Sequence, residues 1–338
     1  MKDCVLLLAF SFLTFFNVNS QNLTEDFNLL MPEAKIKSVY TKLTVIDARI
    51  DTTSMGVIQK GAFNRKAFLK PTIPLKKQIQ DLFVNMVSTE SPAASELLLN
   101  VRDFKFAEVT EAFTETGYCY LRADLFSKKD SMYQKIDSVD AVYEVNSTDV
   151  TKKNIRNGSN KLIDFISSNV NVIKSGPNYS FNDILNITSI EKRKIPVYNT
   201  ATYKDGIYHT FDRFKNIEPS SSQFELTRNK KGKITKLERI WNSGASRAEV
   251  KPSDIFCVVQ NGKIYMASDY GFAPAEFKND DFYFQGKAKV TAKTGNVILA
   301  TAFFGIIGGI IAGDATSEFE MKVDHLNGST VLIKQINK

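Results

Sequence analysis

Two arginine–aspartate pairs on neighbouring segments carry the side chains best placed to do chemistry. Arg102 is followed directly by Asp103, and Arg122 is followed by Asp124 two positions later. Guanidinium and carboxylate groups in this arrangement could bind a polar ligand or hold a carboxylate for acid–base work. The same spacing is typical of cross-strand ion pairs on a solvated sheet face, which is the interpretation we favour. These four residues are the candidate contacts with a partner or ligand.

Other catalytic or metal-binding patterns are not found in the sequence. The two histidines, His209 and His325, stand in separate contexts, and no HExxH, CxxC or calcium-loop spacing occurs. We therefore expect no metal site and no cofactor, and we assign no catalytic residue. A glycosidase-like hydrolase stays open, because two carboxylates at a set distance leave no local motif. His209 is interpreted as a partly buried packing residue of an aromatic-rich helix.

The N-terminus predicts export. Residues 1–20 combine a lysine, an apolar run from Val5 to Phe16 and small polar residues, which is the layout of a signal peptide. The net charge is +7, but acidic residues are interspersed among the basic ones, which favours solvated faces. Anionic envelope polymers or lipid headgroups are the alternative explanation, and nucleic acid is not an expected partner. Cys119 and Cys257 lie in apolar strand-like runs and are predicted to be unpaired core residues.

Residues 294–313 form an uncharged stretch of membrane-spanning length. Thr301, Gly305, Gly309 and Gly313 recur every fourth residue, so on a helix they would form one small-residue packing face. Lysines precede this stretch and acidic residues follow it, which is the reverse of the flanks expected for a stop-transfer segment. We favour an apolar excursion packed on its own domain. Membrane insertion and self-association through the glycine stripe are the alternatives.

Residues 41–170 predict a small α+β sandwich, preceded by a loosely ordered lead-in over residues 21–40. Strand patterns cover residues 42–50, 97–106, 117–126 and 136–145, and helical patterns cover 75–87 and 157–170. Residues 118–125 alternate in polarity, which is typical of a sheet with one buried face. Helices should then cover that face. In topology alone, this layout resembles the periplasmic auxiliary lipoproteins of lipid transporters.

Residues 196–338 predict a mostly β domain, reached through a linker over residues 171–195 that contains a short helix. Turn signals at Lys231-Gly232, Asn261-Gly262 and Asn327-Gly328 separate strand-like runs and predict hairpins. The apolar stretch is inserted before the last hairpin, whose strands should pair with strands before the stretch. Aromatic residues at positions 208, 211 and 214 are predicted to lie on one side of a helix and to belong to the core.

A block in this second half resembles uncharacterised exported proteins of Bacteroidota. The block runs YKDGIY over residues 203–208, followed by Thr210-Phe211, and the later DFYF at 281–284 and the glycine-rich apolar run belong to the same pattern. The resemblance implies a bacterial origin and an exported compartment. It implies no activity and no catalytic residues.

Together, these patterns predict a two-domain α+β protein of the cell envelope, in the periplasm, at the outer membrane or on the cell surface. We expect it to be non-enzymatic and to bind an envelope protein, a lipid or an anionic glycan surface. The alternatives are a secreted carboxylate-dependent hydrolase and an integral membrane component held by residues 294–313.

Overall fold

The computed structural model describes residues 23–61, 65–89, 95–111, 114–147, 149–173, 176–241, 244–288 and 317–336. The signal-like residues 1–20 and the apolar stretch with Thr301, Gly305, Gly309 and Gly313 lie outside these ranges. None of the helices in the described ranges is long and apolar enough to cross a membrane.

The protein is mostly β and is built around a curled, half-barrel sheet of eight strands. The strand order is β1-β5-β4-β7-β8-β9-β10, and β3 also pairs with β7. Strands β2 (Ile36–Ser38) and β6 (Val87–Thr89) form a separate parallel pair. The eight strands are β1 (Leu23–Phe27), β3 (Lys42–Asp47), β4 (Gly56–Lys60), β5 (Arg65–Pro71), β7 (Glu96–Glu111), β8 (Thr114–Lys129), β9 (Met132–Ser147) and β10 (Asn178–Tyr179).

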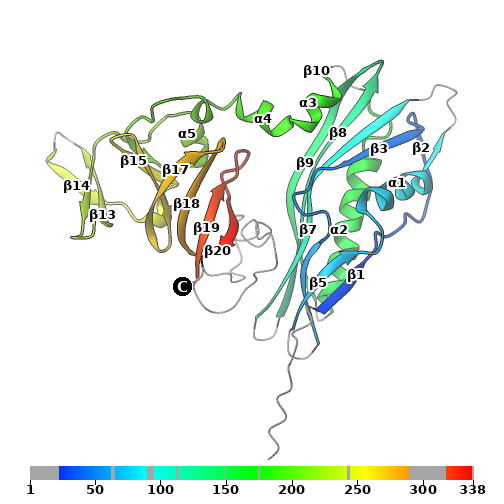
Figure 1. Ribbon diagram of the computed structural model, residues 1–338, viewed down its shortest axis with the longest axis horizontal. Helices are drawn as coiled ribbons and strands as arrows, with labels where there is room; N and C mark the ends of the chain where they lie inside the picture. Colours follow the sequence, from blue (N-terminus) through cyan, green and yellow to red (C-terminus); the bar gives the residue numbers. More distant parts are fainter. Residues whose placement is uncertain are drawn as a thin grey trace, which may run out of the picture.

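Strands β7, β8 and β9 form an antiparallel meander that spans the sheet (Figure 1). Each has 16 residues and extends beyond the predicted segments 97–106, 117–126 and 136–145 at both ends. The predicted lead-in also contains regular structure, because β1 pairs in parallel with β5. Strand pairing supplies order at positions where the side-chain pattern alone is weak.

Helices α1 (Leu75–Met86) and α2 (Val150–Ser167) lie on one face of this sheet (Figure 1). As predicted, α1 buries the residues at the helical spacing, which are Leu75, Ile79, Leu82, Phe83 and Met86. Helix α2 buries Leu162 and Ile166, but it begins at Val150 and so earlier than its apolar pattern predicted. A Cβ atom at Gly158 would come within 2.6 Å of Cys119 Sγ, so this glycine allows α2 to approach the sheet closely.

A second sheet of seven strands forms the meander predicted for the C-terminal half. Its order is β11-β15-β16-β17-β18-β19-β20, and a three-stranded sheet β12-β13-β14 lies beside it (Figure 1). Strand β19 of the last hairpin pairs with β18, which precedes the apolar stretch. This confirms the prediction that the hairpin pairs with strands before that stretch. The strands are β11 (Gly206–Tyr208), β12 (Phe224–Arg228), β13 (Ile234–Trp241), β14 (Ser246–Glu249), β15 (Cys257–Gln260), β16 (Lys263–Ser268), β17 (Gly271–Lys278), β18 (Asp281–Ala288), β19 (Ser317–Val323) and β20 (Thr330–Gln335).

The three predicted hairpin turns are confirmed. They connect β12 to β13, β15 to β16 and β19 to β20. Asn261 and Gly262 both have positive φ, at 52° and 69°, as a type I′ turn between two strands requires.

The predicted aromatic helix is a strand followed by a short helix. Tyr208 ends β11, where it pairs with Cys257, whereas Phe214 lies in α5 (Phe211–Lys215). The two rings still pack edge to face with centroids 5.6 Å apart, so the predicted core role is confirmed. The prediction of a partly buried His209 is wrong, because this residue lies between β11 and α5 and is exposed.

Candidate functional site

The face of β7 and β8 opposite the helices is also buried, although it is polar. On β8, Tyr118, Tyr120, Arg122 and Asp124 are 7%, 6%, 7% and 3% exposed. The prediction of a single buried face is therefore wrong. The polar face is covered by α4 (Ile187–Lys192) and by the loop between β19 and β20, which both bond to its arginines.

A β-bulge in β7 turns two consecutive side chains towards this polar face. The register with β8 shifts between Val101 and Asp103. Leu97, Leu99 and Val101 belong to the helix-covered core before the shift, and Phe104 and Phe106 belong to it afterwards. Because the alternation is reset, both Arg102 and Asp103 line the pocket on the polar face.

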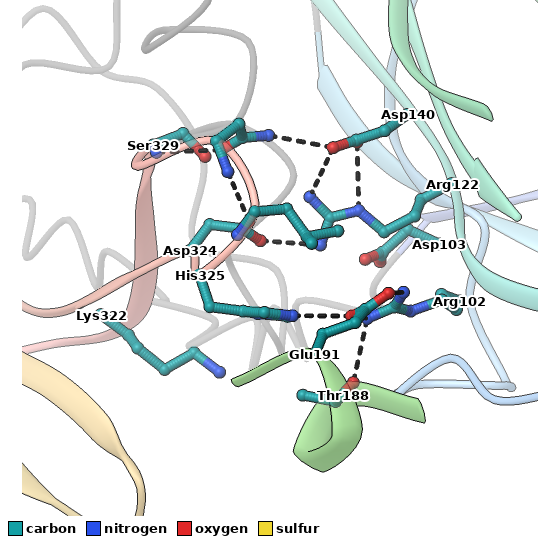
Figure 2. A network of polar contacts seen from close by, with 12 residues as sticks. Arg102, Asp103, Arg122, Asp140, Thr188, Glu191, Lys322, Asp324, His325 and Ser329 are labelled. Atoms are coloured by element: carbon teal, nitrogen blue, oxygen red, sulfur yellow. Dashed lines mark hydrogen bonds and ion pairs between the residues drawn. The ribbon is translucent and has the colours of Figure 1, made fainter. Parts of the chain in front are cut away.

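Arg102 binds α4 through a two-pronged ion pair. Its two terminal nitrogens each donate to a carboxylate oxygen of Glu191 at 2.8 Å, and one also donates to Thr188 at 3.0 Å (Figure 2). His325 Nε2 lies 2.8 Å from the same carboxylate. Burial alone would raise the pKa of Glu191, but hydrogen bonds from His325 and Arg102 outweigh it and lower this pKa to about 2.

Arg122 joins the two sheets. It donates to both oxygens of Asp140 on β9 at 3.1 and 3.0 Å, and to Asp324 in the β19–β20 loop at 2.7 Å (Figure 2). Asn327 of the same loop donates to Asp140 at 3.2 Å. Burial alone would lower the pKa of Arg122, but Asp324 and Asp140 raise it above its ordinary value. The Arg122 guanidinium therefore links the two sheets through ion pairs.

The four predicted contact residues come together here, although not on a solvated face. Arg102 and Asp124 form the expected cross-strand pair at 3.4 Å, and Lys135 also binds Asp124 at 2.6 Å. Asp103 pairs with Lys105 at 2.6 Å. The side chains of Arg102 and Asp124 are only 9% and 4% exposed, so the solvated-face interpretation of this pair is wrong.

A pocket of about 240 Å³ lies between the polar face, the helices α3 (Phe181–Leu185) and α4, and the last hairpin. Two side-chain atoms of buried lining residues, Asn100 Oδ1 and Ser329 Oγ, have no hydrogen-bond partner within the described part of the chain. The lining consists of Ala48, Ile50, Asn100, Arg102, Asp103, Lys105, Tyr120, Arg122, Ile184, Leu185, Ile187, Thr188, Lys322, Asp324, His325, Ser329, Val331 and Ile333.

Sequence reasoning missed the residues that complete this site from a distance. Glu191 lies 89 positions from Arg102, and Asp324 lies 202 positions from Arg122. No local pattern links positions so far apart. The predicted linker over residues 171–195 supplies α3 and α4, two short helices where one was predicted, and the sequence did carry a signal for the first of these. Ser180 and Asp183 form a capping box at the start of α3.

The described residues give no support for a metal-binding site or for a reactive cysteine. Within those ranges, no group of three or more His, Cys, Asp or Glu side chains could hold a metal ion. Cys119 and Cys257 are buried and unpaired, as predicted. Burial raises the pKa of both thiols, which disfavours the reactive thiolate form.

Comparisons with known proteins add little. No family model matches the chain, and no curated protein matches it. Among solved structures, protein XCC0632 from Xanthomonas campestris, of family DUF330, is 10% identical, with a TM-score of 0.28 over 43% of this chain and 91% of that one. A second structure, described as an uncharacterized protein, is 10% identical, with a TM-score of 0.25 over 44% and 96% of the two chains. Scores this low carry no argument about fold or function.

Proposed function

We propose that this chain is an exported, non-enzymatic protein of the cell envelope that acts by binding. In this proposal, an N-terminal α+β unit over residues 41–170 and a β-rich unit over residues 196–338 present the pocket between them. The signal-like residues 1–20 support export to the periplasm, the outer membrane or the cell surface. An envelope protein, a lipid or a glycan surface would be the partner.

The observation that carries the proposal is the state of the carboxylates in the pocket wall. Asp103 is paired with Lys105 at 2.6 Å and Asp324 with Arg122 at 2.7 Å. Burial alone would raise the pKa of Asp324, but Arg122 outweighs it and holds this pKa below its ordinary value. The Asp324 carboxylate therefore stays ionised, and both carboxylates are occupied by their partners, which suits recognition of a ligand.

The same observation counts against the alternative of a carboxylate-dependent hydrolase. Hydrolysis of a glycoside needs one carboxyl group that stays protonated near neutral pH and donates its proton to the leaving group. Glu191, next to the pocket, has its pKa lowered to about 2, which is the wrong direction. Glu108 has its pKa raised to about 7, but it does not line the pocket.

Capture from envelopes of the native host tests the proposal. The mature chain, residues 21–338, would be immobilised, incubated with washed envelope fragments, and analysed for bound protein, lipid and glycan. We expect reproducible capture of one of these classes and no new fragments when isolated envelope glycan is incubated with the chain. Repeated capture of nothing would contradict a binding function. Release of glycan fragments would establish the hydrolase instead.

A further inference from the structure

We infer that the pocket binds a neutral, hydroxyl-rich ligand of the size of one sugar ring, such as a terminal unit of an envelope glycan. This inference rests on the proposed binding function and names the chemical class of its ligand. Three properties of the pocket point to this class: the charge balance of its wall, its unpartnered polar atoms and its apolar side.

The charges of the wall are already compensated. Each cation that lines the pocket has a carboxylate partner: Arg102 pairs with Glu191, Lys105 with Asp103, Arg122 with Asp140 and Asp324, and Lys322 with Asp281. A charged ligand would have to displace one of these partners or remain uncompensated in a partly buried site, and either event costs free energy. A neutral ligand avoids both costs.

A ligand hydroxyl group matches the two unpartnered atoms. Asn100 and Ser329 are 2% and 4% exposed, and the orphaned atoms are the side-chain oxygens of both. A buried polar atom without a partner has lost its hydrogen bonds to water without replacement, which costs free energy. Both oxygens are closed to solvent in the unliganded protein, so a ligand hydroxyl reaches them once the two side chains turn towards the pocket. It can then donate to Asn100 Oδ1 and can either donate to or accept from Ser329 Oγ. Because a hydroxyl has both roles, it would also match the asparagine with its amide group flipped.

The remaining wall is apolar and the space is small. Aliphatic side chains lie on α3, α4 and β20, and they include Ile187, Val331 and Ile333. The C–H face of a sugar ring can pack against such side chains while its hydroxyls point at polar atoms. The volume of about 240 Å³ is below the roughly 300–1,000 Å³ of pockets for drug-sized ligands, which favours a single ring.

Saturation-transfer NMR and calorimetry with soluble sugars test the inference. The probes are glucose, galactose, mannose and N-acetylglucosamine, each compared with glucuronic acid and glucosamine as charged counterparts. We expect at least one neutral sugar to bind more tightly than either charged sugar. Binding of no neutral sugar, or tighter binding of a charged one, would overturn the inference.

Ser329→Ala locates the binding in the pocket. Ser329 Oγ has no partner among the residues that the structure describes, so its removal should leave the unfolding free energy unchanged or slightly raised. Loss of one ligand hydrogen bond should weaken sugar binding about 2- to 10-fold. Ser138→Ala, at an exposed serine of β9 away from the pocket, should match the wild type. Equal affinity of all three proteins would place the sugar elsewhere and overturn the inference.

The two proposals fail in different ways. If envelope fragments are captured but no neutral sugar binds, the binding function stands and only the ligand class is wrong. If a neutral sugar binds in the pocket but envelopes are not captured, the ligand class stands and the envelope role is wrong.

Discussion

The two faces of strands β7 and β8 are both buried, but they are buried by different chemistry. On the helix-covered face, Leu121 and Leu125 are fully inaccessible and pack among aliphatic and aromatic side chains. On the opposite face, Arg122 and Asp124 are nearly as inaccessible and are held by ion pairs. Hydrophobic burial stabilises a fold without direction, whereas ion pairs fix one docking geometry and add little net stability.

Two glutamates show the same contrast in their acidity. Glu108 faces the helix side, where Thr151 of α2 and the amide of Gln59 donate to one of its oxygens, and burial raises its pKa to about 7. Glu191 covers the polar face, where His325 and Arg102 outweigh burial and lower its pKa to about 2. Burial alone therefore does not set the acidity of a carboxyl group, and the nearest cation decides the direction.

The largest loss of stability is expected when the ion pairs of Arg122 between the two sheets are removed. Arg122→Met leaves the buried carboxylate of Asp324 without its cation and removes the partner of the more exposed Asp140, and should lower the unfolding free energy by about 3–5 kcal/mol. Urea unfolding of the variant measures this loss. Adding Asp324→Leu to the variant should recover part of it, because one uncompensated charge is removed. A loss below about 1 kcal/mol would contradict the view that buried ion pairs of Arg122 hold the two sheets together.

A somewhat smaller loss is expected on the opposite face of the same strand. Leu121→Ala removes a fully buried side chain and should cost about 2–4 kcal/mol through lost burial and a residual cavity. This loss should not change with pH between 5 and 8, because the substitution removes no charge. Leu185→Ala, at a half-exposed position of α3, is the control and should cost little. A pH-dependent loss for Leu121→Ala would contradict the contrast between the faces.

The dependence of the unfolding free energy on acidic pH should report on the ionisation of Glu191. Its pKa falls from an ordinary value of 4.5 to about 2 in the folded protein. Its stabilising effect is therefore present above about pH 4.5 and is lost as the pH falls towards about 2. Glu191→Gln should cost about 1.5–3 kcal/mol at pH 7, and the difference from wild type should shrink over that acid range. A difference that is constant with pH would contradict the assignment.

Glu108 should give the opposite and smallest effect. Its pKa rises from 4.5 to about 7, so the folded protein loses stability as the pH rises between these values. Glu108→Gln removes the charge and should raise the unfolding free energy at pH 8 by about 1–2 kcal/mol. Unfolding curves at pH 4 and pH 8 measure this, and a variant that is less stable than wild type at pH 8 would contradict the account.

The helix-covered face could be predicted because its information is local. The spacing of apolar residues in α1 and the alternation of Cys119, Leu121 and Ala123 are visible within short windows of the sequence. Turn chemistry at Asn261-Gly262 was equally local, since a two-residue hairpin demands residues that tolerate positive φ. These features are dictated by near neighbours in the chain.

The polar face could not be predicted because its information is spread over the chain. The sequence marked Arg102 and Arg122, but their partners Glu191 and Asp324 come from a segment read as linker and from the last hairpin. The bulge that turns Arg102 and Asp103 to the same side has no sequence signal of its own here. Only the packing of the second sheet against the first shows that this face is buried.

The central claim is that the pocket between the polar face of β7 and β8 and the last hairpin binds the ligand, while the helix-covered face only maintains the fold. The most direct test compares capture of envelope fragments by Ser329→Ala and by Leu121→Val, with the unfolding free energy of each measured beside it. We predict that Ser329→Ala keeps its stability and loses about 2- to 10-fold in capture, whereas Leu121→Val loses about 1 kcal/mol of stability and captures normally. Normal capture by Ser329→Ala together with reduced capture by Leu121→Val would contradict the claim.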